Sequence, residues 1–587
     1  RALPAGRDAM GCHGGLRVAP PSVRACPMAS RLTWFHRAVW LGLSLLVIRL
    51  ADLQLLHGSS FRASAERNRI RVIPQLAPRG LLLDRAGRQL ATNHLAFRLA
   101  IIPQEAGRVE PVLAHVSRMT NTSTAQLSRA FAQARSLPFL PAPILNPVPK
   151  RVALRVEEAR WQLPGVLVEP VATRAYPLGE VAAHVIGYLG EPSAEAFPVL
   201  KTYGVRPHDL VGRAGLEWQL DQFLHGRAGG SLIEVDHRGR QRRVLGFRPP
   251  LPGESVTLTL DARLQAAIER HFGSQAGACV VLNPSTGEVL AMVSRPGFDP
   301  NLFSEQRQSE IQRLLHDPAS PLLNRATDGV YLPGSILKLM TAMAALEHHV
   351  VRPEWSVECR GSLLLGDRRF HCWNRDGHGV VSLREALQQS CNVYFMQVGR
   401  RVGLARLRAQ LAHGGLGRQT GWLMEEQRGH LPVGRRLTEG EVALLAIGQG
   451  QILVTPIQVA VMVSAIANGG RLVTPWILAE VGGQAIPPPA SRPLGWSRES
   501  LETIRRAMIA VVNEPSGTGV AARSDQVRIA GKTGTAQTHR PGQTHGWFVG
   551  FCPAEAPRLA MAIVAEYGGS GGGLPASIAK VICEENR

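Results

Sequence analysis

The sequence has 587 residues, of which 45% are hydrophobic and 19% are charged, so a wholly disordered chain is excluded. This length predicts about three or four folding units. The formal net charge is +21, but the basic residues are mostly arginine, are spread along the chain and accompany no zinc-finger or RNA-binding motif. We therefore expect no nucleic-acid partner. We interpret the charge chiefly as an arginine-rich genome composition, and secondarily as a basic surface that suits an anionic membrane or cell-wall polymer.

The first 31 residues differ in composition from the rest of the chain. Residues 1–31 show no periodic pattern and are rich in Gly, Pro and Arg, so we interpret them as a disordered leader or as the result of a start site assigned too early, with Met28 as the true start. Residues 32–56 form an apolar run with the length of one bilayer span, which predicts a transmembrane anchor. Basic residues near its start favour a cytoplasmic N-terminus, namely Arg24, Arg31 and Arg37.

Two charges interrupt the apolar run. Arg49 and Asp52 are three residues apart, so on a helix they share a face and can pair. Charges inside a span usually face a protein partner. A cleaved signal peptide is the alternative, but no cleavage site with small residues follows the run. We therefore predict a single-pass anchor, with everything after residue 57 outside the cytoplasm.

Residues 60–250 alternate short strand-like runs with turns, and helical patterns appear near 124–134 and 216–224. No catalytic set of residues stands out in this region. We interpret it as a non-catalytic pedestal or dimerisation-type module that spaces and orients the C-terminal domain.

A break rich in proline and glycine at 249–253 separates this module from a domain expected at 254–575. Its pattern predicts a strand at 255–261, a helix at 262–272, a β-hairpin at 278–294 and a helical block within 330–510. Two closing strands are predicted at 547–551 and 559–567. This order predicts an α+β fold in which helices sandwich one antiparallel sheet. We set residues 576–587 apart as a C-terminal tail.

The chemistry of this domain begins at Ser335, in the sequence Pro-Gly-Ser-Ile-Leu-Lys. Pro-Gly marks a helix start, so Ser335 lies in the first turn and Lys338 lies on the same face. A hydroxyl needs a base to become a nucleophile, and a buried amine can serve as that base. The chain has only five lysines, and an arginine could not replace this one as a base. Alone, the spacing is weak evidence, since a capping serine and a surface lysine would look the same.

Two further motifs follow in order. Ser390-Cys391-Asn392 lies at the edge between a helix and a loop, and Lys532-Thr533-Gly534-Thr535 lies on a predicted strand. S-x-x-K followed by S-D-N and K-T-G is the known set of penicillin-binding enzymes, and here Cys391 replaces the aspartate. Together, the three motifs are strong evidence for acyl transfer through a serine.

With these motifs the chain resembles the class B penicillin-binding proteins, and most closely their elongation-specific branch. The resemblance covers nearly the whole chain and includes the segments 77–93, 212–226, 368–379, 446–458 and 546–551. One departure is that Ile336 follows the serine, where the family usually has threonine. The resemblance implies a C-terminal transpeptidase domain related in fold to serine β-lactamases.

The resemblance also implies a role for each motif residue in cross-linking peptidoglycan stem peptides during elongation and rod-shape maintenance. Ser335 would attack the D-Ala–D-Ala carbonyl with Lys338 as base, and Ser390 would pass a proton to the leaving D-Ala. Asn392 would bind the substrate amide and Lys532 would tune the charge near Ser390. Thr533 and Thr535 would bind the terminal carboxylate of the substrate. The backbone N–H groups of Ser335 and Thr535 would form the oxyanion hole, and Gly534 belongs to the same substrate-binding and oxyanion segment. β-Lactams would acylate Ser335.

The same resemblance places the anchor in the inner membrane and the catalytic domain in the periplasm. It implies partners in the elongation complex, which are a membrane glycosyltransferase and rod-shape proteins. No glycosyltransferase region is visible in the sequence itself.

Four residues form a candidate metal site near the second motif. Cys359, Cys372, His378 and Cys391 have the spacing C-x12-C-x5-H-x12-C, and Cys₃His is a normal structural zinc set. The resemblance adds that some elongation-type members hold zinc here. The alternatives are a Cys359–Cys372 disulfide and unrelated buried thiols. The chemistry itself requires no cofactor.

Other functions share the motifs. A β-lactamase would need a water-activating group and fast deacylation, and it would not need the anchor and the module at 60–250. A D,D-carboxypeptidase would use water as acceptor, and the sequence leaves this open as a side reaction. A penicillin-sensing receptor would need more membrane spans. A membrane-anchored scaffold of the elongation complex would use residues 60–250 and the Arg49/Asp52 face for docking.

Overall fold

The computed structural model of the chain describes residues 27–62, 70–135, 137–138, 140–206, 209–236, 241–432, 437–538 and 540–585. These residues fall into two compact units, a small one up to residue 71 together with 233–243, and a large one with 72–232 and 244–587. Residues 1–26, which include most of the predicted leader and Arg24, lie outside the described residues.

The predicted membrane anchor is a helix. α1 (Pro27–Ala51) continues into a π-helical turn, η1 (Asp52–Leu56). Within Leu32–Leu56 an 18-residue window has a mean hydropathy of 1.8 and no buried residue, and in the described part of the chain this is the one helix long and apolar enough to cross a membrane. Arg49 and Asp52 form the expected ion pair.

The pedestal is built on a sheet that continues into the second domain. Its strands run in the order β19-β18-β10-β2-β3-β4, and β5 also pairs with β3. They are β2 (Leu82–Leu83), β3 (Gln89–Ile101), β4 (Ala142–Val148), β5 (Val166–Ala175), β10 (Val256–Leu258), β18 (Leu478–Val481) and β19 (Gln484–Ala485). β10 pairs with β2 in parallel and with β18 antiparallel. The predicted break at 249–253 therefore does not separate two sheets.

Amphipathic helices bury their apolar faces against this sheet. They are α4 (Val109–Thr120), α5 (Thr124–Ala134) and α6 (Lys150–Glu158), and they share a core with Leu99 and Ile101 of β3. α5 matches the predicted helix, and it begins at Ser123, whose side chain and that of Gln126 form a capping box.

Shorter elements complete the pedestal region. They are β1 (Ile70–Gln75), α3 (Pro103–Ala106), η2 (Arg160–Gln162), α7 (Ala183–Ile186), β6 (Leu189–Gly190), α8 (Phe197–Leu200), η3 (Lys201–Tyr203), β7 (Val211–Gly212), α9 (Gly215–Gln219), α10 (Asp221–Leu224), β8 (Gly229–Val235) and β9 (Gln241–Arg248).

A buried ion network joins two of the segments that carry the family resemblance, 77–93 and 212–226. Arg79 pairs with Glu217 at 2.7 Å and with Asp221 at 2.9 Å, and Arg174 pairs with Glu217 at 2.6 Å. Burial alone would raise the pKa of Glu217, but Arg174 and Arg79 outweigh it and hold this pKa below its usual value. The charged residues in these segments therefore act as one structural unit.

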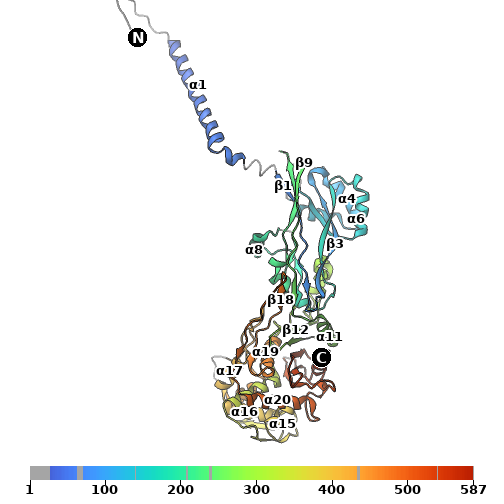
Figure 1. Ribbon diagram of the computed structural model, residues 1–587, viewed down its shortest axis with the longest axis vertical. Coiled ribbons are helices and arrows are strands. Elements are labelled where there is room, and N and C mark those ends of the chain that lie inside the picture. The colour runs from blue at the N-terminus through green and yellow to red at the C-terminus, as the bar shows by residue number, and fades with distance from the viewer. Residues whose placement is uncertain are drawn as a thin grey trace, which may run out of the picture. The chain divides into compact units, whose positions relative to one another are not determined.

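The second domain contains the predicted antiparallel sheet, which confirms the α+β fold class. Its order is β12-β11-β23-β22-β21. The strands are β11 (Gly277–Leu282), β12 (Val289–Arg295), β21 (Ala530–Gln537), β22 (Thr544–Cys552) and β23 (Leu559–Ala565). Alternate residues bury opposite faces. Met561 and Ile563 share a core with α11 (Ala262–Phe272) and α21 (Leu574–Glu585), while Ala562 and Val564 share one with α19 (Pro456–Ala467). Figure 1 shows α11 beside β12, which it contacts.

The remaining elements are α12 (Asn301–Ser304), α13 (Gln308–Leu315), η4 (Gly334–Leu337), α14 (Lys338–Glu347), β13 (Val357–Cys359), β14 (Ser362–Leu365), β15 (Arg368–His371), β16 (Gly379–Val381), α15 (Leu383–Gln388), α16 (Asn392–Val402), α17 (Leu404–His413), α18 (Glu439–Ala446), β17 (Arg471–Leu472), β20 (Arg492–Pro493), α20 (Arg498–Asn513) and η5 (Val520–Ala522).

The chain end is folded as far as residue 585. Residues 576–585, which we expected to be part of a separate tail, form most of α21. Ile578 and Ile582 are buried in the core shared with α11, and a disulfide joins Cys583 to Cys552 of β22. The apolar spacing of this helix is the physical reason that it packs rather than remaining a tail.

Candidate active site

Ser335 lies on a short turn held between two segments. η4 (Gly334–Leu337) is a 3₁₀-helix and Lys338 opens α14 directly after it, so Ser335 and Lys338 are three residues apart on one continuous helical turn. Gly334 has φ of +56°, and a Cβ there would come within 2.8 Å of the Thr535 carbonyl oxygen. A Cβ on Gly448 would come within 2.0 Å of the Gly334 carbonyl oxygen. Both glycines are needed for this close approach, which fixes the position of Ser335.

Lys338 is fully buried and reaches the second motif. Its Nζ donates to the Ser390 carbonyl oxygen at 2.7 Å, to Asn392 Oδ1 at 2.7 Å and to Ser390 Oγ at 3.2 Å. Burial lowers the pKa of Lys338 to about 8. An amine with this pKa can be neutral near physiological pH and can accept a proton. In the described residues no hydrogen bond joins it to Ser335 Oγ, and such contacts commonly tighten only when substrate binds.

Lys532 approaches the same hydroxyl from the sheet. It lies on the edge strand β21, is fully buried, and donates from Nζ to Ser390 Oγ at 2.9 Å and to the Thr533 carbonyl oxygen at 2.9 Å. Burial, and then the positive charge of Lys338, lower the pKa of Lys532 well below its ordinary value. Two amines therefore meet at Ser390 Oγ, and neither forms an ion pair with a described carboxylate.

Ser390 lies between α15 and α16 with φ of +58°, an unusual conformation for a residue with a side chain. Its backbone N–H donates to the Leu387 carbonyl oxygen at 3.3 Å, which supports this turn. Such strain is typical of functional sites, where the surroundings enforce it. The S-x-N motif thus occupies the helix-to-loop edge that the sequence predicted.

The rest of the third motif lines the edge of β21. Thr535 is exposed, whereas Thr533 is buried and its Oγ1 lies 2.6 Å from Thr518 Oγ1. A Cβ on Gly534 would come within 3.0 Å of Ile336 and Trp547, so a glycine lets β21 lie against η4. The strand therefore brings its backbone at Gly534 and Thr535 against the turn that carries Ser335.

The segment after α20 supports the site and was not predicted from the sequence. Thr518 forms a side-chain hydrogen bond with Thr533. Ser516 Oγ accepts a hydrogen bond from Nε2 of Gln388 at 2.7 Å, and Gln388 lies two residues before Ser390. A small-residue turn, Ser-Gly-Thr-Gly at 516–519, is the signal that could have indicated a segment packed against a functional loop.

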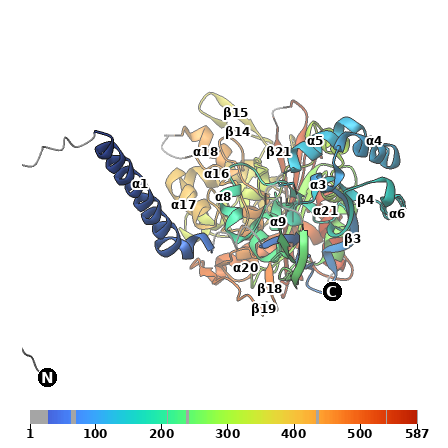
Figure 2. The same cartoon turned by 90° about the horizontal axis from the view of Figure 1, so that it is seen from above.

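The four predicted metal ligands come together beside this site. The ligand atoms of Cys359, Cys372, His378 and Cys391 all lie within 4.8 Å of one another. Cys359 ends β13, Cys372 follows β15, His378 precedes β16 and Cys391 caps α16. Figure 2 shows the β14–β15 hairpin near α18, where a Cβ on Gly440 would come within 2.8 Å of the Phe370 ring. Three other potential ligands close in sequence, Asp367, His371 and Asp376, stand outside the group.

The geometry of this group fits zinc. A tetrahedral site with Zn–S of about 2.3 Å and Zn–N of about 2.0 Å requires S···N separations of about 3.6 Å. His378 Nδ1 lies 3.5 Å from Cys359 Sγ and 3.6 Å from Cys372 Sγ. The three cysteines are buried and carry free thiols, so the alternative Cys359–Cys372 disulfide is not formed.

Comparison with known proteins agrees with the motifs. The family described as "Penicillin binding protein transpeptidase domain" matches residues 277–584, and the one described as "Penicillin-binding Protein dimerisation domain" matches residues 74–258. The chain is 32% identical to the peptidoglycan D,D-transpeptidase MrdA of Acinetobacter baumannii over 564 residues, which cover 90% of this chain and 83% of that protein.

Two solved structures are similar over most of the chain. One is a complex between PBP2 and MreC from Helicobacter pylori, with 26% identity, a TM-score of 0.78, and coverage of 88% of this chain and 99% of that chain. The other comes from a study of the structural coordination of polymerization and crosslinking by a peptidoglycan synthase complex, with 30% identity, a TM-score of 0.71, and coverage of 95% and 99%. Because two family domains match in order and the relatives align over nearly the whole sequence, the chain belongs to the penicillin-binding proteins, in the group of the PBP2 (MrdA) transpeptidases.

Proposed function

We propose that the protein is a membrane-anchored peptidoglycan D,D-transpeptidase that cross-links stem peptides through an acyl-enzyme on Ser335. The observation that carries this proposal is the meeting of two fully buried lysines at one serine hydroxyl, beside the half-buried Ser335. A buried amine without a carboxylate partner is poised to exchange a proton, which a purely structural lysine has no need to do.

Acylation follows from these positions. Neutral Lys338 takes the proton of Ser335 Oγ as the oxygen bonds to the carbonyl carbon of the penultimate D-Ala. Backbone N–H groups of Ser335 and Thr535 stabilise the oxyanion, each worth roughly 10²–10³ in rate. The proton then passes from Lys338 through Ser390 Oγ, 3.2 Å away, to the nitrogen of the terminal D-Ala. The C–N bond breaks and D-Ala leaves.

The second half-reaction reverses the proton path. The amine of another stem peptide attacks the acyl carbon, loses a proton to the Lys338–Ser390 pair, and releases Ser335 with its hydroxyl restored. Thr533 and Thr535 hold the carboxylate of the donor, and Asn392 binds its amide. A β-lactam acylates Ser335 by the same first step, but the amine released when the ring C–N bond breaks stays tethered to the acyl group.

We assign Cys359, Cys372, His378 and Cys391 to a structural zinc ion. When bound, zinc supplies a cross-link rather than a reactive group. Cys391 stands between Ser390 and Asn392, and the backbone N–H of Asn392 donates to Cys372 Sγ at 3.4 Å. These ligands therefore hold the turn that presents the Ser390 hydroxyl and the Asn392 amide.

The helix Leu32–Leu56 anchors the protein in the inner membrane, with the catalytic domain in the periplasm. Partners in the elongation complex follow from the similar structures, one of which contains MreC and one a peptidoglycan synthase complex. A membrane glycosyltransferase and rod-shape proteins are the partners we expect, and the pedestal is the region available to bind them. This scaffold role accompanies catalysis.

A labelled penicillin tests the proposal. The purified protein should form a stable adduct on Ser335, identified by mass spectrometry, and the Ser335→Ala variant should form none. Release of the label within seconds would instead indicate a β-lactamase, and release of D-Ala from stem peptides without cross-linking would indicate a carboxypeptidase. A folded wild-type protein without an adduct would leave only the scaffold role.

A further inference from the structure

A pocket of about 410 Å³ lies apart from Ser335, between the pedestal and the second domain. It is lined by residues of the segment from α7 to α9, by Phe298, and by residues of 322–328 and 424–425. Its volume is within the usual range for pockets that bind small ligands, about 300–1,000 Å³. None of the three catalytic motifs contributes a residue to it.

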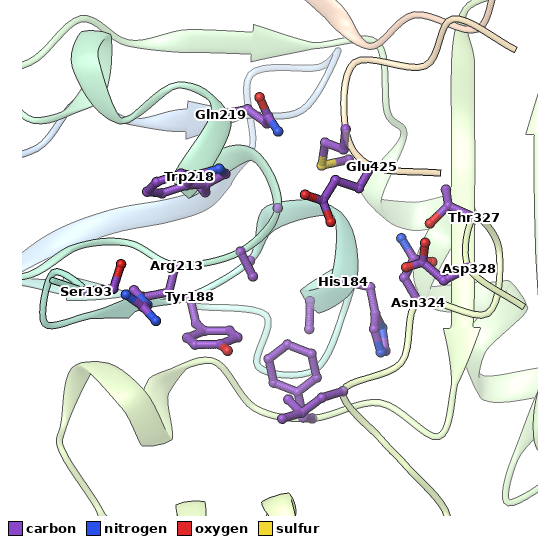
Figure 3. A pocket seen from close by; sticks show the side chains of 17 residues that line it. His184, Tyr188, Ser193, Arg213, Trp218, Gln219, Asn324, Thr327, Asp328 and Glu425 are labelled. Carbon is purple, nitrogen blue, oxygen red and sulfur yellow. The ribbon is translucent and has the colours of Figure 1, made fainter. Parts of the chain in front are cut away.

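One wall of the pocket is negatively charged and lacks a cation. Figure 3 shows Asp328 and Glu425 near each other on one side of the pocket. Neither carboxylate forms an ion pair in the described part of the chain. Burial, and then the charges of Glu425 and Glu426, raise the pKa of Asp328. Glu426 faces elsewhere, since its carboxylate accepts from the backbone N–H groups of residues 420–422.

A buried hydroxyl beside this wall also lacks a partner. Thr327 is 1% exposed, and its Oγ1 forms no hydrogen bond of normal geometry with a described residue, although it lies near enough to Asp328 to moderate the rise of that pKa. An unpaired buried hydroxyl costs free energy unless something binds it. Its position in the pocket lining therefore points to a polar group supplied by a ligand.

The opposite side of the pocket is positively charged. Figure 3 shows Arg213 on this side, with Tyr188 and Ser193 nearby. The guanidinium donates to the Glu191 carbonyl oxygen at 3.3 Å and forms no ion pair with a described carboxylate. A Cβ on Gly190 would come within 2.8 Å of Arg213 Cγ, so this glycine makes room for the side chain. Arg213 is exposed at the pocket, and no described carboxylate neutralises its charge.

Aromatic side chains provide apolar surface between the two charged sides. Tyr188 stacks on Phe303 with ring centroids 3.9 Å apart, and it meets Phe298 edge-on at 5.9 Å. Trp218 is 40% exposed at the pocket. Rigid aromatic surface flanked by a few placed polar groups is characteristic of a binding site.

We infer that this pocket binds a short zwitterionic peptide, with its ammonium group at Asp328 and Glu425 and its carboxylate at Arg213. A phosphate-bearing ligand would meet the two carboxylates, and an apolar ligand would leave all three charges desolvated without partners. A peptidoglycan stem peptide is the member of this class available to the protein, and that identification, unlike the charge pattern, rests on the proposed function. The pocket then binds this peptide outside the catalytic cleft.

The test uses the full-length protein with Ser335 first acylated by penicillin, so that the catalytic cleft is blocked. Binding of L-alanyl-D-alanyl-D-alanine with free termini is measured by isothermal titration calorimetry. The variants Glu425→Gln and Arg213→Gln should each weaken binding by roughly tenfold. The control Glu499→Gln removes an exposed charge outside the pocket and should leave affinity unchanged.

Modified peptides assign the two ends. The wild-type protein should bind the N-acetyl peptide roughly tenfold more weakly than the peptide with free termini. The Glu425→Gln variant should bind the N-acetyl peptide with the same affinity as the wild-type protein does, because the ammonium group that Glu425 contacts is already absent. The peptide with a C-terminal amide should give the same pattern with Arg213→Gln. Absence of binding to the wild-type protein, or equal affinity in all variants, overturns the inference. If penicillin forms no adduct, the proposed function fails, yet the same variants still test the pocket on the unmodified protein.

Discussion

Replacement of Lys338 by methionine removes the proposed base while keeping a side chain of similar length in a fully buried site. General-base catalysis contributes roughly 10²–10⁴ in rate, so the acylation rate constant should fall by about that factor. In the wild-type protein a pKa of about 8 leaves about one tenth of Lys338 neutral at pH 7 and half at pH 8. The acylation rate should therefore rise about fivefold over that interval.

Stopped-flow measurement with a fluorescent penicillin gives the second-order acylation constant of each variant between pH 6 and pH 9. Lys201→Met is the matched control, because Lys201 is exposed and outside the site, and it should retain the wild-type rate and pH profile. Circular dichroism should show that Lys338→Met is folded. An acylation constant within tenfold of wild type in a folded Lys338→Met protein, or a wild-type rate that does not change with pH, would refute the assignment of Lys338 as the base.

Two further predictions concern stability, and a third concerns the metal group. Burial lowers the pKa of His184 to about 4, so as the pH falls the unfolded chain binds a proton at this residue before the folded protein does. The free energy of unfolding should therefore fall by about 2 kcal/mol from pH 7 to pH 5. Denaturant titration should show this loss in the wild type and not in His184→Gln. Cys359→Ser should lose stoichiometric zinc and slow acylation, whereas Cys279→Ser, at a buried thiol outside the metal group, should retain both by elemental analysis and penicillin labelling. Cys583→Ser opens a loop of 31 residues and should cost about 3–4 kcal/mol of unfolding free energy, and an unchanged denaturation midpoint would contradict this.

Local patterns in the sequence predicted local structure well. The helices 124–134 and 262–272 match α5 and α11, because their apolar spacing and their capping residues act within a few residues of one another. The hairpin at 278–294 is β11 and β12 for the same reason. The three motifs likewise specified residue types at fixed spacing, and the structure brings Lys338, Ser390 and Lys532 together.

Contacts between distant segments could not be predicted in this way. Arg79 and Glu217 are 138 residues apart, and nothing in either segment indicates which buried charge will pair with the other. The pairing of β10 with β2 and the Cys552–Cys583 disulfide also depend on the folded topology. Thr518 was missed because its role follows from its contact with Thr533 and not from a motif of its own.

The shared sheet of the pedestal has a consequence for how this chain can vary. Because β10 lies between β2 and β18, a cut at 249–253 would free one edge of β10, and an unpaired strand edge readily pairs with other chains. The second domain alone would therefore be prone to aggregate. Exchange of pedestals between relatives should succeed only when β2 (Leu82 and Leu83) is transferred together with β10, the strand with which it pairs. Recombination within this family is thus expected to preserve the β2–β10 pair as one inherited piece.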